Sequence, residues 1–391
     1  MSSTHPQQKQ IVVIGGGYIG IQFAQELAKL VPASHAAITV IEKNEFTYHA
    51  MGVPRAFVDP SYVPKLFIPL AHALPASHSK VIRGMAESIE ANHVLVRPIV
   101  DNQLQERTTS VPFDYLILAT GSTYASPIKV AAGAYTREGI ERAVVETAAR
   151  IKAASSVLIV GGGPVGIEVA GEIAAAYPDK KVTILDAHAK LVSNSGLNDK
   201  FRATLGTRLT QLGVKLVLGE RLSDRVTEHG FDPKTVVTDR GTQIASDVQL
   251  VCAGMTPNTA WIRKFDASLL DDHHAVRVTP ALQVDDPRFA NMFAIGDVNN
   301  HPTPKLAYTG AIQAKHMARQ LAKLIKKGSG NIAPFVVSGG DAMLVPLGPN
   351  GGVAQLPLFG GIVAGDMIVR AAKAKDYFAG KMWGTWHASL P

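Results

Sequence analysis

Residues 11–44 read IVVIGGGYIGIQFAQELAKLVPASHAAITVIEKN, and residues 157–188 read VLIVGGGPVGIEVAGEIAAAYPDKKVTILDAH. Each stretch begins with an apolar β-branched strand, continues through a glycine turn and an amphipathic helix that stops at Pro32 or Pro178, and ends in a second apolar strand. This is a β-α-β unit that occurs twice in one chain. Two such units predict parallel sheets with helices packed outside them. The expected fold class is therefore α/β, with two Rossmann-like domains.

Each copy carries the glycine spacing of a dinucleotide-binding turn, directly after a strand expected at Gln10–Ile14 or Ser156–Val160. The first glycine allows the tight turn, the second lets backbone amides approach a pyrophosphate, and the third lets helix and strand pack closely. The phosphates then lie at the positive end of a helix. The expected contacts are Gly15, Gly16, Gly17, Tyr18, Ile19 and Gly20 in the first copy, and Gly161, Gly163 and Gly166 in the second.

The second strand of each copy ends in an acid, Glu42 or Asp186, and Lys43 follows the first of these. A carboxylate at this place accepts hydrogen bonds from a ribose. Two dinucleotide sites suggest two dinucleotides, and FAD with a nicotinamide nucleotide is the pair that reacts by hydride transfer. Asp186 would repel a 2′-phosphate, which favours NADH. NADPH stays open, because a nearby basic residue could reverse the preference.

The two helices differ in one charged residue shortly after the third glycine. The first copy has Gln22 where the second has Glu168. A carboxylate there lies beyond the pyrophosphate and could reach a nicotinamide carboxamide, which makes Glu168 a candidate catalytic residue. The alternative is an acid that only complements the dipole of its helix.

The composition limits the class of protein. The chain has 391 residues, 46% of them hydrophobic, a net charge of +7 and a single cysteine, Cys252. An intrachain disulfide and a CxxC redox pair are therefore impossible, and Cys252 is expected in the core. The first ten residues lack the apolar segment of a secretory signal, and Ser2 excludes the usual myristoyl anchor. No stretch reaches the ~20 apolar residues of a spanning helix. The positive charge fits either a solvated basic surface or attraction to anionic partners.

Two further strands end in glycine motifs. Phe113–Leu118 precedes Ala-Thr-Gly at 119–121, and Asn291–Ile295 precedes Gly296 and Asp297. With these motifs the chain resembles the pyridine nucleotide–disulfide oxidoreductase superfamily, in which the first strand leads into an NAD domain and the second returns to an FAD domain. The resemblance implies an FAD-binding domain at 1–122 and 275–330, an inserted NAD(P)H-binding domain at 123–274, and a small α+β C-terminal domain at 331–391.

The resemblance also implies how the flavin is held. Asp297 would bind the ribityl chain, with a plain turn residue as the alternative. A helix expected near Leu306–Leu324 would direct its N-terminus at the flavin pyrimidine and stabilise its reduced, anionic form. The further FAD contacts implied are Thr120, Gly121, Gly296, Lys305, Leu306 and Ala307. No metal site is expected.

Within the superfamily the chain is similar to the apoptosis-inducing factor 2, or ferroptosis suppressor protein, group and its fungal relatives. The matching landmarks are TYHAMGVPRAFVDP, LILATGST, VGGGPVGIEVAGEI, CAGMTPN, FAIGDV, TPKLAYTGAIQA and, most specifically, LGPNGGVAQL with KAKDYF in the tail. The resemblance places Arg55 and the backbone near Ala86 at FAD. Lys373 and Phe378 fall where the tail closes over the flavin and quinone. A solvated lysine and a core phenylalanine are the alternatives.

The tail, residues 334–391, has glycine turns at 339–340 and 351–352 that suggest a hairpin, then a basic helix with Arg370, Lys373 and Lys375, then Trp383 and Trp386. Basic residues interleaved with aromatic ones are typical of a surface that contacts a bilayer interface. Docking of the tail on the core and formation of a homodimer are the alternatives.

The function expected from these observations is an FAD-dependent oxidoreductase that takes hydride from NADH, or NADPH, and reduces a quinone or similar lipophilic acceptor. One alternative is a reductase of a small electron-carrier protein or radical. Another, of a different class, is a nucleic-acid-binding or death-signalling flavoprotein, although no basic stripe predicts specific nucleic-acid binding. We expect an intracellular protein, either cytoplasmic or peripheral to a membrane such as that of a mitochondrion or lipid droplet.

Overall fold

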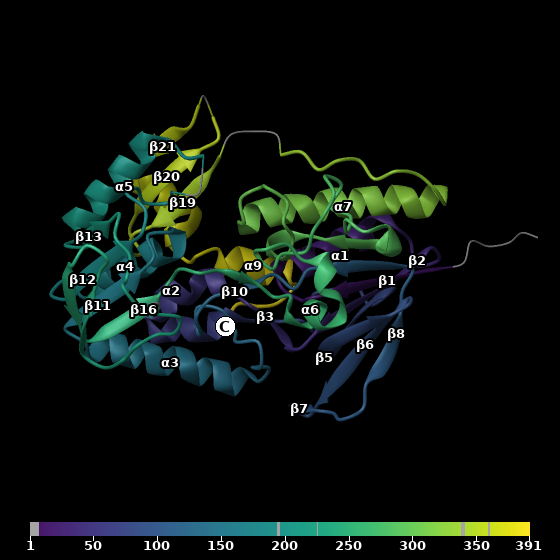
Figure 1. Ribbon diagram of the computed structural model, residues 1–391. Helices are drawn as coiled ribbons and strands as arrows, with labels where there is room; N and C mark the ends of the chain where they lie inside the picture. The colour runs from purple at the N-terminus through teal and green to yellow at the C-terminus, as the bar shows by residue number, and fades with distance from the viewer. Residues whose placement is uncertain (1–7, 194–195, 225, 338–340, 359) are drawn as a thin grey trace, which may run out of the picture.

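The computed structural model describes residues 8–193, 196–224, 226–337, 341–358 and 360–391. The first dinucleotide-binding domain is built on a sheet of order β18-β9-β1-β2-β5-β6-β7, with β8 paired to β6 (Figure 1). Strands β18, β9, β1, β2 and β5 are parallel, whereas β6 is antiparallel to β5 and to β8. The bounds are β1 Lys9–Ile14, β2 Ala36–Glu42, β5 Ser79–Glu90, β6 His93–Val100, β7 Gln103–Leu104, β8 Thr109–Pro112, β9 Tyr115–Leu118 and β18 Met292–Ala294.

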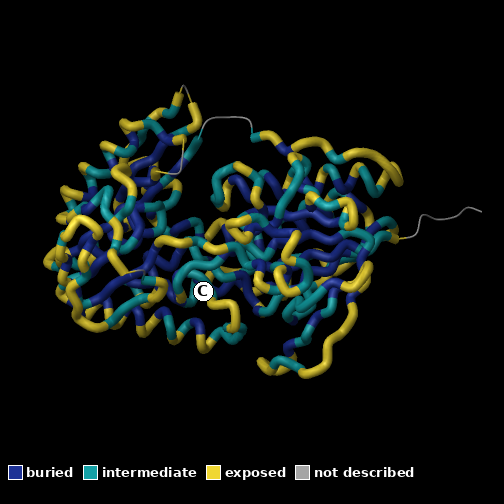
Figure 2. Tube along the Cα trace, in the orientation of Figure 1, coloured by how far each residue is buried: buried dark blue, intermediate teal, exposed yellow. Residues whose placement is uncertain are grey.

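Strand β1 shows why the sheet is covered on both faces. Ile11 and Val13 belong to one apolar cluster, while Val12 and Ile14 belong to another. Alternate side chains of a strand point to opposite faces, so a continuous apolar strand needs packing partners on both. Helices α1 (Tyr18–Leu30) and α7 (Ala307–Lys327) contact each other and supply buried residues to the first cluster. In Figure 2 the strands β1, β2, β9 and β18 of this sheet are largely buried trace, whereas β5 to β8 are mostly intermediate or exposed.

The second dinucleotide-binding domain repeats the pattern with an all-parallel sheet of order β13-β12-β11-β16. The prediction of two Rossmann-like sheets is confirmed. The bounds are α3 Arg137–Ala153, β11 Ser156–Val160, α4 Pro164–Ala176, β12 Lys181–Asp186, α5 Asp199–Gln211, β13 Lys215–Leu218 and β16 Val248–Val251, with a hairpin of β14 Lys234–Val237 and β15 Gln243–Ser246.

The two chain segments that connect these domains lie side by side. Strand β10 (Ser122–Thr123) pairs antiparallel with β17 (Thr256–Pro257). The next helix, α6 (Ala260–Asp266), contacts β5, and its Ile262 lies in the cluster under the first sheet. We therefore propose that the chain returns to the first domain near residue 258, earlier than the boundary at 275 that the sequence suggested.

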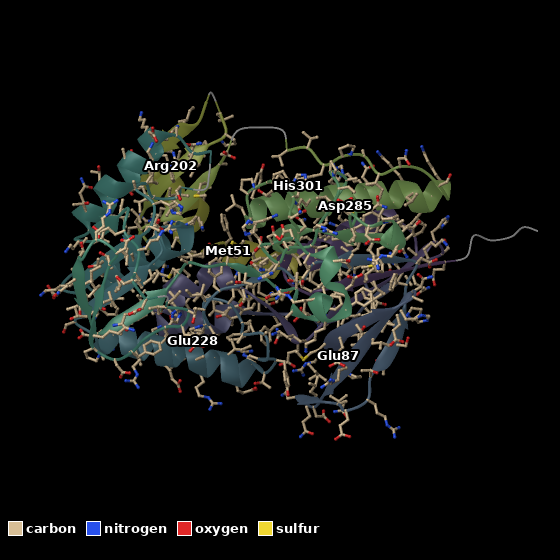
Figure 3. All side chains as sticks on the ribbon, in the orientation of Figure 1. Met51, Glu87, Arg202, Glu228, Asp285 and His301 are labelled. Atoms are coloured by element: carbon tan, nitrogen blue, oxygen red, sulfur yellow. The ribbon has the colours of Figure 1, made fainter. Side chains whose placement is uncertain are left out.

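Between the two large sheets lie short elements that become important for the site. Strands β3 (Phe46–Tyr48) and β4 (Phe67–Pro69) pair antiparallel, and helix α2 (Val53–Ala56) follows β3 and contacts α4. Figure 3 marks this junction by Met51, which lies near the middle of the view. No helix among the described residues is both long and apolar enough to cross a bilayer.

The tail forms a three-stranded antiparallel sheet, β19 (Met343–Pro346), β20 (Gly352–Leu356) and β21 (Ile362–Ala364). The hairpin predicted at residues 351–352 is present, and residues 339–340 lie outside the described residues. The predicted basic helix is present, because α8 (Asp366–Val369) continues directly into a π-helical turn (Arg370–Ala374) that carries Arg370 and Lys373. A separate short helix, α9 (Ala379–Thr385), follows it.

The two tail tryptophans do not face outward. Trp383 and Trp386 are 6% and 0% exposed. Their indole N–H groups donate to Lys65 O (3.0 Å) and to Thr47 Oγ1 (2.8 Å). The interpretation of these tryptophans as a membrane-facing set was wrong, because an indole that finds both apolar cover and an acceptor is stable in a core.

Candidate functional site

The first glycine turn has the geometry of a nucleotide cradle. Gly15 adopts φ = +113°, which favours glycine, and a Cβ on Gly20 would collide with the carbonyl oxygen of Gly15. Gly17 caps the N-terminus of α1 and faces open space, with nothing within 4 Å of the place of a Cβ. The space in front of Gly17 can therefore accept a phosphate group. The turn is also held by Thr47, whose Oγ1 donates to Gly16 O at 2.5 Å.

The acids that end β2 and β12 are held in the same way in both copies. Glu42 Oε2 accepts from Gly16 N at 2.6 Å, and Asp186 Oδ2 accepts from Gly162 N at 2.6 Å. These contacts place each carboxylate beside its glycine turn. The remaining acceptor capacity of each carboxylate can serve a ribose hydroxyl.

The late Gly-Asp motif meets the crossing segment. Asp297 Oδ2 accepts from Ser122 Oγ at 2.6 Å and pairs with Lys129 Nζ at 3.3 Å. Gly296 N donates to Gln313 Oε1 of α7 at 2.7 Å. The motif, the crossing segment and the helix expected at the flavin are thus brought together. Lys129 was not found by sequence reasoning.

The residues that precede α7 are held by side-chain hydrogen bonds. Lys305 Nζ donates to Asn299 Oδ1 at 3.0 Å and to His301 O at 2.9 Å. Burial lowers the pKa of Lys305. Leu306 is the N-cap and Ala307 the first residue of α7, so the helix begins where sequence placed it.

The tail closes on the second domain through an ion pair. Lys373 Nζ donates to Glu168 Oε1 at 2.5 Å and to Leu344 O at 3.2 Å. The side chains of Lys373 and Glu168 are 13% and 6% exposed. Burial raises the pKa of Glu168, and the neighbouring ammonium of Lys373 opposes that rise. Two of the three catalytic candidates are therefore in direct contact.

One turn further along α4, Glu172 forms a second buried contact between three segments. Arg55 of α2 donates from Nε to Glu172 Oε2 at 2.7 Å and from Nη2 to Oε1 at 2.9 Å. Arg55 Nη2 also donates to Ala374 O at 2.9 Å, and Tyr377 OH donates to Glu172 Oε1 at 3.0 Å. The guanidinium of Arg55 thus binds Glu172 and the tail, as a buried guanidinium requires paired acceptors. Its contact with FAD stays a prediction.

Phe378, the third catalytic candidate, lies in a strained bend of the backbone. Tyr377 and Phe378 have φ of +51° and +66°, and two successive left-handed non-glycine residues persist only when their surroundings hold them. Tyr377 is fully buried, and Tyr62 OH donates to Asp376 O at 2.7 Å. The bend fixes the start of α9, with Phe378 as its N-cap residue.

Four other sequence candidates are placed as follows. Ala86 lies at an irregularity of β5 where the pairing with β6 shifts register. Lys43 Nζ donates to Ala131 O and Ala132 O at 2.7 and 2.8 Å, and burial lowers its pKa. Thr120 Oγ1 donates to Asn258 O at 2.9 Å. Gly121 has φ = +68°.

A family model described as pyridine nucleotide-disulphide oxidoreductase matches residues 9–314. The chain belongs to this family. It is 29% identical to human ferroptosis suppressor protein 1 over 97% of this chain and 96% of that protein. It is 28% identical to apoptosis-inducing factor homolog B of Dictyostelium discoideum, over 95% of each. Among solved structures, the sulfide:quinone oxidoreductase of Aquifex aeolicus has the same fold, with a TM-score of 0.74 and 16% identity over 98% of this chain and 92% of that one.

As a member of the pyridine nucleotide-disulphide oxidoreductase family, the chain is an NAD(P)H-dependent flavoprotein oxidoreductase, with FAD and NAD(P)H as its cofactors. The residues fit both groups: Gly17 and Gly163 each face open space at a helix N-terminus, and Glu42 and Asp186 stand beside these turns. Among the residues that the structure describes, no group of three or more His, Cys, Asp or Glu could hold a metal.

The single cysteine does not supply thiol chemistry to this flavoprotein. Cys252 is 4% exposed, and burial raises the pKa of its thiol to about 12. A protonated, covered thiol is neither a nucleophile nor a disulfide partner. Electrons therefore leave the protein by a route other than a dithiol.

Sequence reasoning missed Glu172, Tyr377 and Lys129. Glu172 had an available signal, because it follows Glu168 by four residues and must share its helix face. Tyr377 lies within the KAKDYF landmark of the tail, but nothing local indicates its bond to Glu172, 205 residues away. Nothing local indicates the pairing of Lys129 with Asp297, 168 residues away.

Proposed function

We propose that this chain passes electrons from NADH through FAD to a quinone. The observation that carries the proposal is the Lys373–Glu168 contact, which joins the tail to the glycine-turn helix of the second domain. In this proposal the first turn holds FAD and the second holds NADH. The flavin, when bound, supplies hydride acceptance and electron release.

The residues of the chain then serve binding and proton supply. Lys373 holds a proton at Nζ, and a reduced quinone oxygen needs a proton donor. Glu168 keeps that ammonium in place through the 2.5 Å contact. Phe378, whose ring lies 6.0 Å from Lys381 Nζ, would offer an apolar ring to a flat, lipophilic acceptor. Asp297 and the residues at the N-terminus of α7 would hold the flavin, and the positive end of that helix would favour the anionic reduced form.

The comparisons with known proteins support a quinone as the acceptor. The solved structure with the same fold is named for quinone reduction, and ferroptosis suppressor protein 1 is similar over nearly its full length. The covered thiol of Cys252 argues against disulfide acceptors. A flat organic oxidant is the acceptor class that remains most consistent with these observations.

The experiment measures reoxidation of the reduced protein by a short-chain ubiquinone analogue in Lys373→Met and in Lys326→Met. Lys326 is exposed near the end of α7, so its variant is the control for loss of a lysine charge. Lys373→Met should slow reoxidation by about 10²-fold, the usual value for a lost acid, while Lys326→Met should behave as wild type. Equal rates in all three proteins would remove Lys373 from the mechanism.

We also propose that a lipid surface meets the tail at α8 rather than at the tryptophans. Met367 is 83% exposed and Ile368 40%. Arg370 and Lys375 line a surface hollow of about 550 Å³ together with Met367. Apolar side chains flanked by cations suit an anionic bilayer. Sedimentation with vesicles of anionic lipid should weaken in Met367→Glu, and unchanged binding would reject this surface.

A further inference from the structure

The outer face of α7 carries a row of positive charge. The row is made by four exposed residues at intervals of four along the helix: Lys315, Arg319, Lys323 and Lys327. Residues four apart lie on the same face of a helix, so their side chains form one line, which extends about 18 Å along the helix axis. These four residues are called the cationic row. The opposite face of α7 is buried in the first apolar cluster.

The chain around α7 does not neutralise the cationic row. Between Asp297 and Asp341 the sequence has six Lys or Arg residues and no Asp or Glu. Residues 328–337 belong to this stretch and run beside the helix (Figure 1), where Ala333 O lies 3.0 Å from His316 Nε2. The segment that lies along α7 therefore adds no negative charge to this face.

Helix α1, which packs against α7, supplies little compensation. Glu26 is the one acid in its sequence, and Glu26 Oε1 lies 3.9 Å from Arg319 Nε. An exposed pair at this distance is weak, and Lys29 of the same helix is itself exposed. Among the residues that the structure describes, the three lysines of the cationic row have no ion-pair partner. The row is therefore available to an anionic partner.

Helix α3 shows that such a row is not the ordinary surface of this protein. Its 17 residues contain four cations and three acids, whereas the 21 residues of α7 contain five cations and no acid. Charges of both signs nearly cancel at a distance, while a row of one sign produces a field that attracts opposite charge. The contrast favours a binding surface at α7 over a merely solvated helix face.

The chemistry of the row favours an anionic bilayer as the partner. Three of its four cations are lysines. Arginine is the residue that suits bidentate recognition of nucleic-acid phosphates, whereas lysine is a strongly hydrated point charge on a flexible stem. Protein–protein interfaces are depleted in lysine, but lysines near a membrane are attracted to anionic headgroups without a fixed geometry. A quinone is lipophilic, so a bilayer is also where the proposed acceptor dissolves.

We propose that the cationic row of α7 docks the protein on a bilayer that contains anionic lipid. The inference deepens the proposed function, on which it rests for the lipophilic acceptor. It differs from the contact proposed for α8, because Met367 would insert an apolar side chain, whereas the row attracts through charge alone. The screening length falls from about 10 Å at 0.1 M salt to about 3 Å at 1 M. Docking by the row should therefore be lost at high salt.

The test is sedimentation of the FAD-loaded protein with phosphatidylcholine vesicles, with and without phosphatidylserine, at about 0.1 M and about 1 M salt. The row variant neutralises the three lysines: Lys315→Gln/Lys323→Gln/Lys327→Gln. The matched control removes three exposed cations of α3: Arg142→Gln/Arg150→Gln/Lys152→Gln. Glutamine is close to both replaced residues in helix propensity. Neither NADH nor quinone is present, so a failure to dock is distinct from a failure to pass electrons.

Wild type should bind vesicles with phosphatidylserine at the lower salt, and not those without it. A lysine near an anionic surface raises affinity about fivefold, so the row variant should bind about 10²-fold more weakly and Lys323→Gln alone about fivefold more weakly. The α3 variant should bind as wild type does, and high salt should abolish the differences. Unchanged binding of the row variant, or an equal loss in the α3 variant, would refute the proposal. Displacement of the vesicles by a DNA duplex at equal phosphate concentration would also refute it, since the partner would then be a nucleic acid.

Discussion

The contact between Arg55 and Glu172 predicts a large loss of stability when either partner is removed. The two side chains are 9% and 1% exposed and are joined by two hydrogen bonds. Removing one partner leaves a buried, unpaired charge, which costs about 3–5 kcal/mol. Replacing both by apolar residues removes that penalty, so Arg55→Met/Glu172→Met should be more stable than the sum of the single losses.

The magnitude can be expressed as a melting temperature. Unfolding entropy is about 2.1 cal/mol/K per residue, so a chain of 391 residues that unfolds as one unit loses about 1.2 °C for each kcal/mol. Arg55→Met and Glu172→Met should therefore each lower Tm by about 4–6 °C.

The assay is differential scanning calorimetry of the FAD-loaded protein at one salt concentration, with Lys375→Met as a control for a surface charge. The double-mutant cycle gives the coupling energy directly. Single variants that melt with wild type would contradict the buried pair. Additive losses in the double variant would show that the two side chains do not interact.

Three further predictions concern the cradle, a buried histidine and the tail. Gly20→Ala should destabilise the apoprotein, because the added Cβ would collide with Gly15 O. Gly17→Ala should unfold at the wild-type temperature but bind FAD more weakly, because its Cβ would enter the space open to the phosphate. Calorimetry of the apoprotein and titration with FAD distinguish these two outcomes. Burial lowers the pKa of His49 to about 4. The stability that it contributes is therefore complete above about pH 6.5 and is lost as pH falls to 4, by about 3 kcal/mol; His49→Gln should reduce the fall of the measured Tm over that interval. Trp386→Phe removes the hydrogen bond to Thr47 and should cost about 1–2 kcal/mol, which thermal unfolding followed by indole and flavin fluorescence would detect.

The sequence predicted the elements whose signal is local. The strand expected at Ser156–Val160 is β11, and the strand expected at Gln10–Ile14 begins one residue earlier, at Lys9. The helix expected near Leu306–Leu324 covers Ala307–Lys327. These elements carry an apolar period or a glycine turn within a few residues, and packing reinforces the same pattern.

The contacts that join the three parts of the chain could not be predicted in this way. Arg55 and Glu172 are 117 residues apart, and Glu172 and Tyr377 are 205 apart. The periodic pattern of apolar residues along the chain does not indicate contacts between residues so far apart. The tryptophans of the tail show the same limit, because an aromatic residue beside cations suits a lipid surface and a buried hydrogen-bonded site equally well.

The passage of electrons from NADH through the flavin to a quinone is tested by anaerobic stopped-flow mixing of the FAD-loaded protein with NADH, followed by a second mixing with a short-chain ubiquinone analogue or with oxygen. We expect rapid bleaching of the flavin by NADH and rapid recovery with quinone, but slow recovery with oxygen. A bound flavin that NADH does not bleach, or a reduced flavin that quinone does not reoxidise, would contradict it.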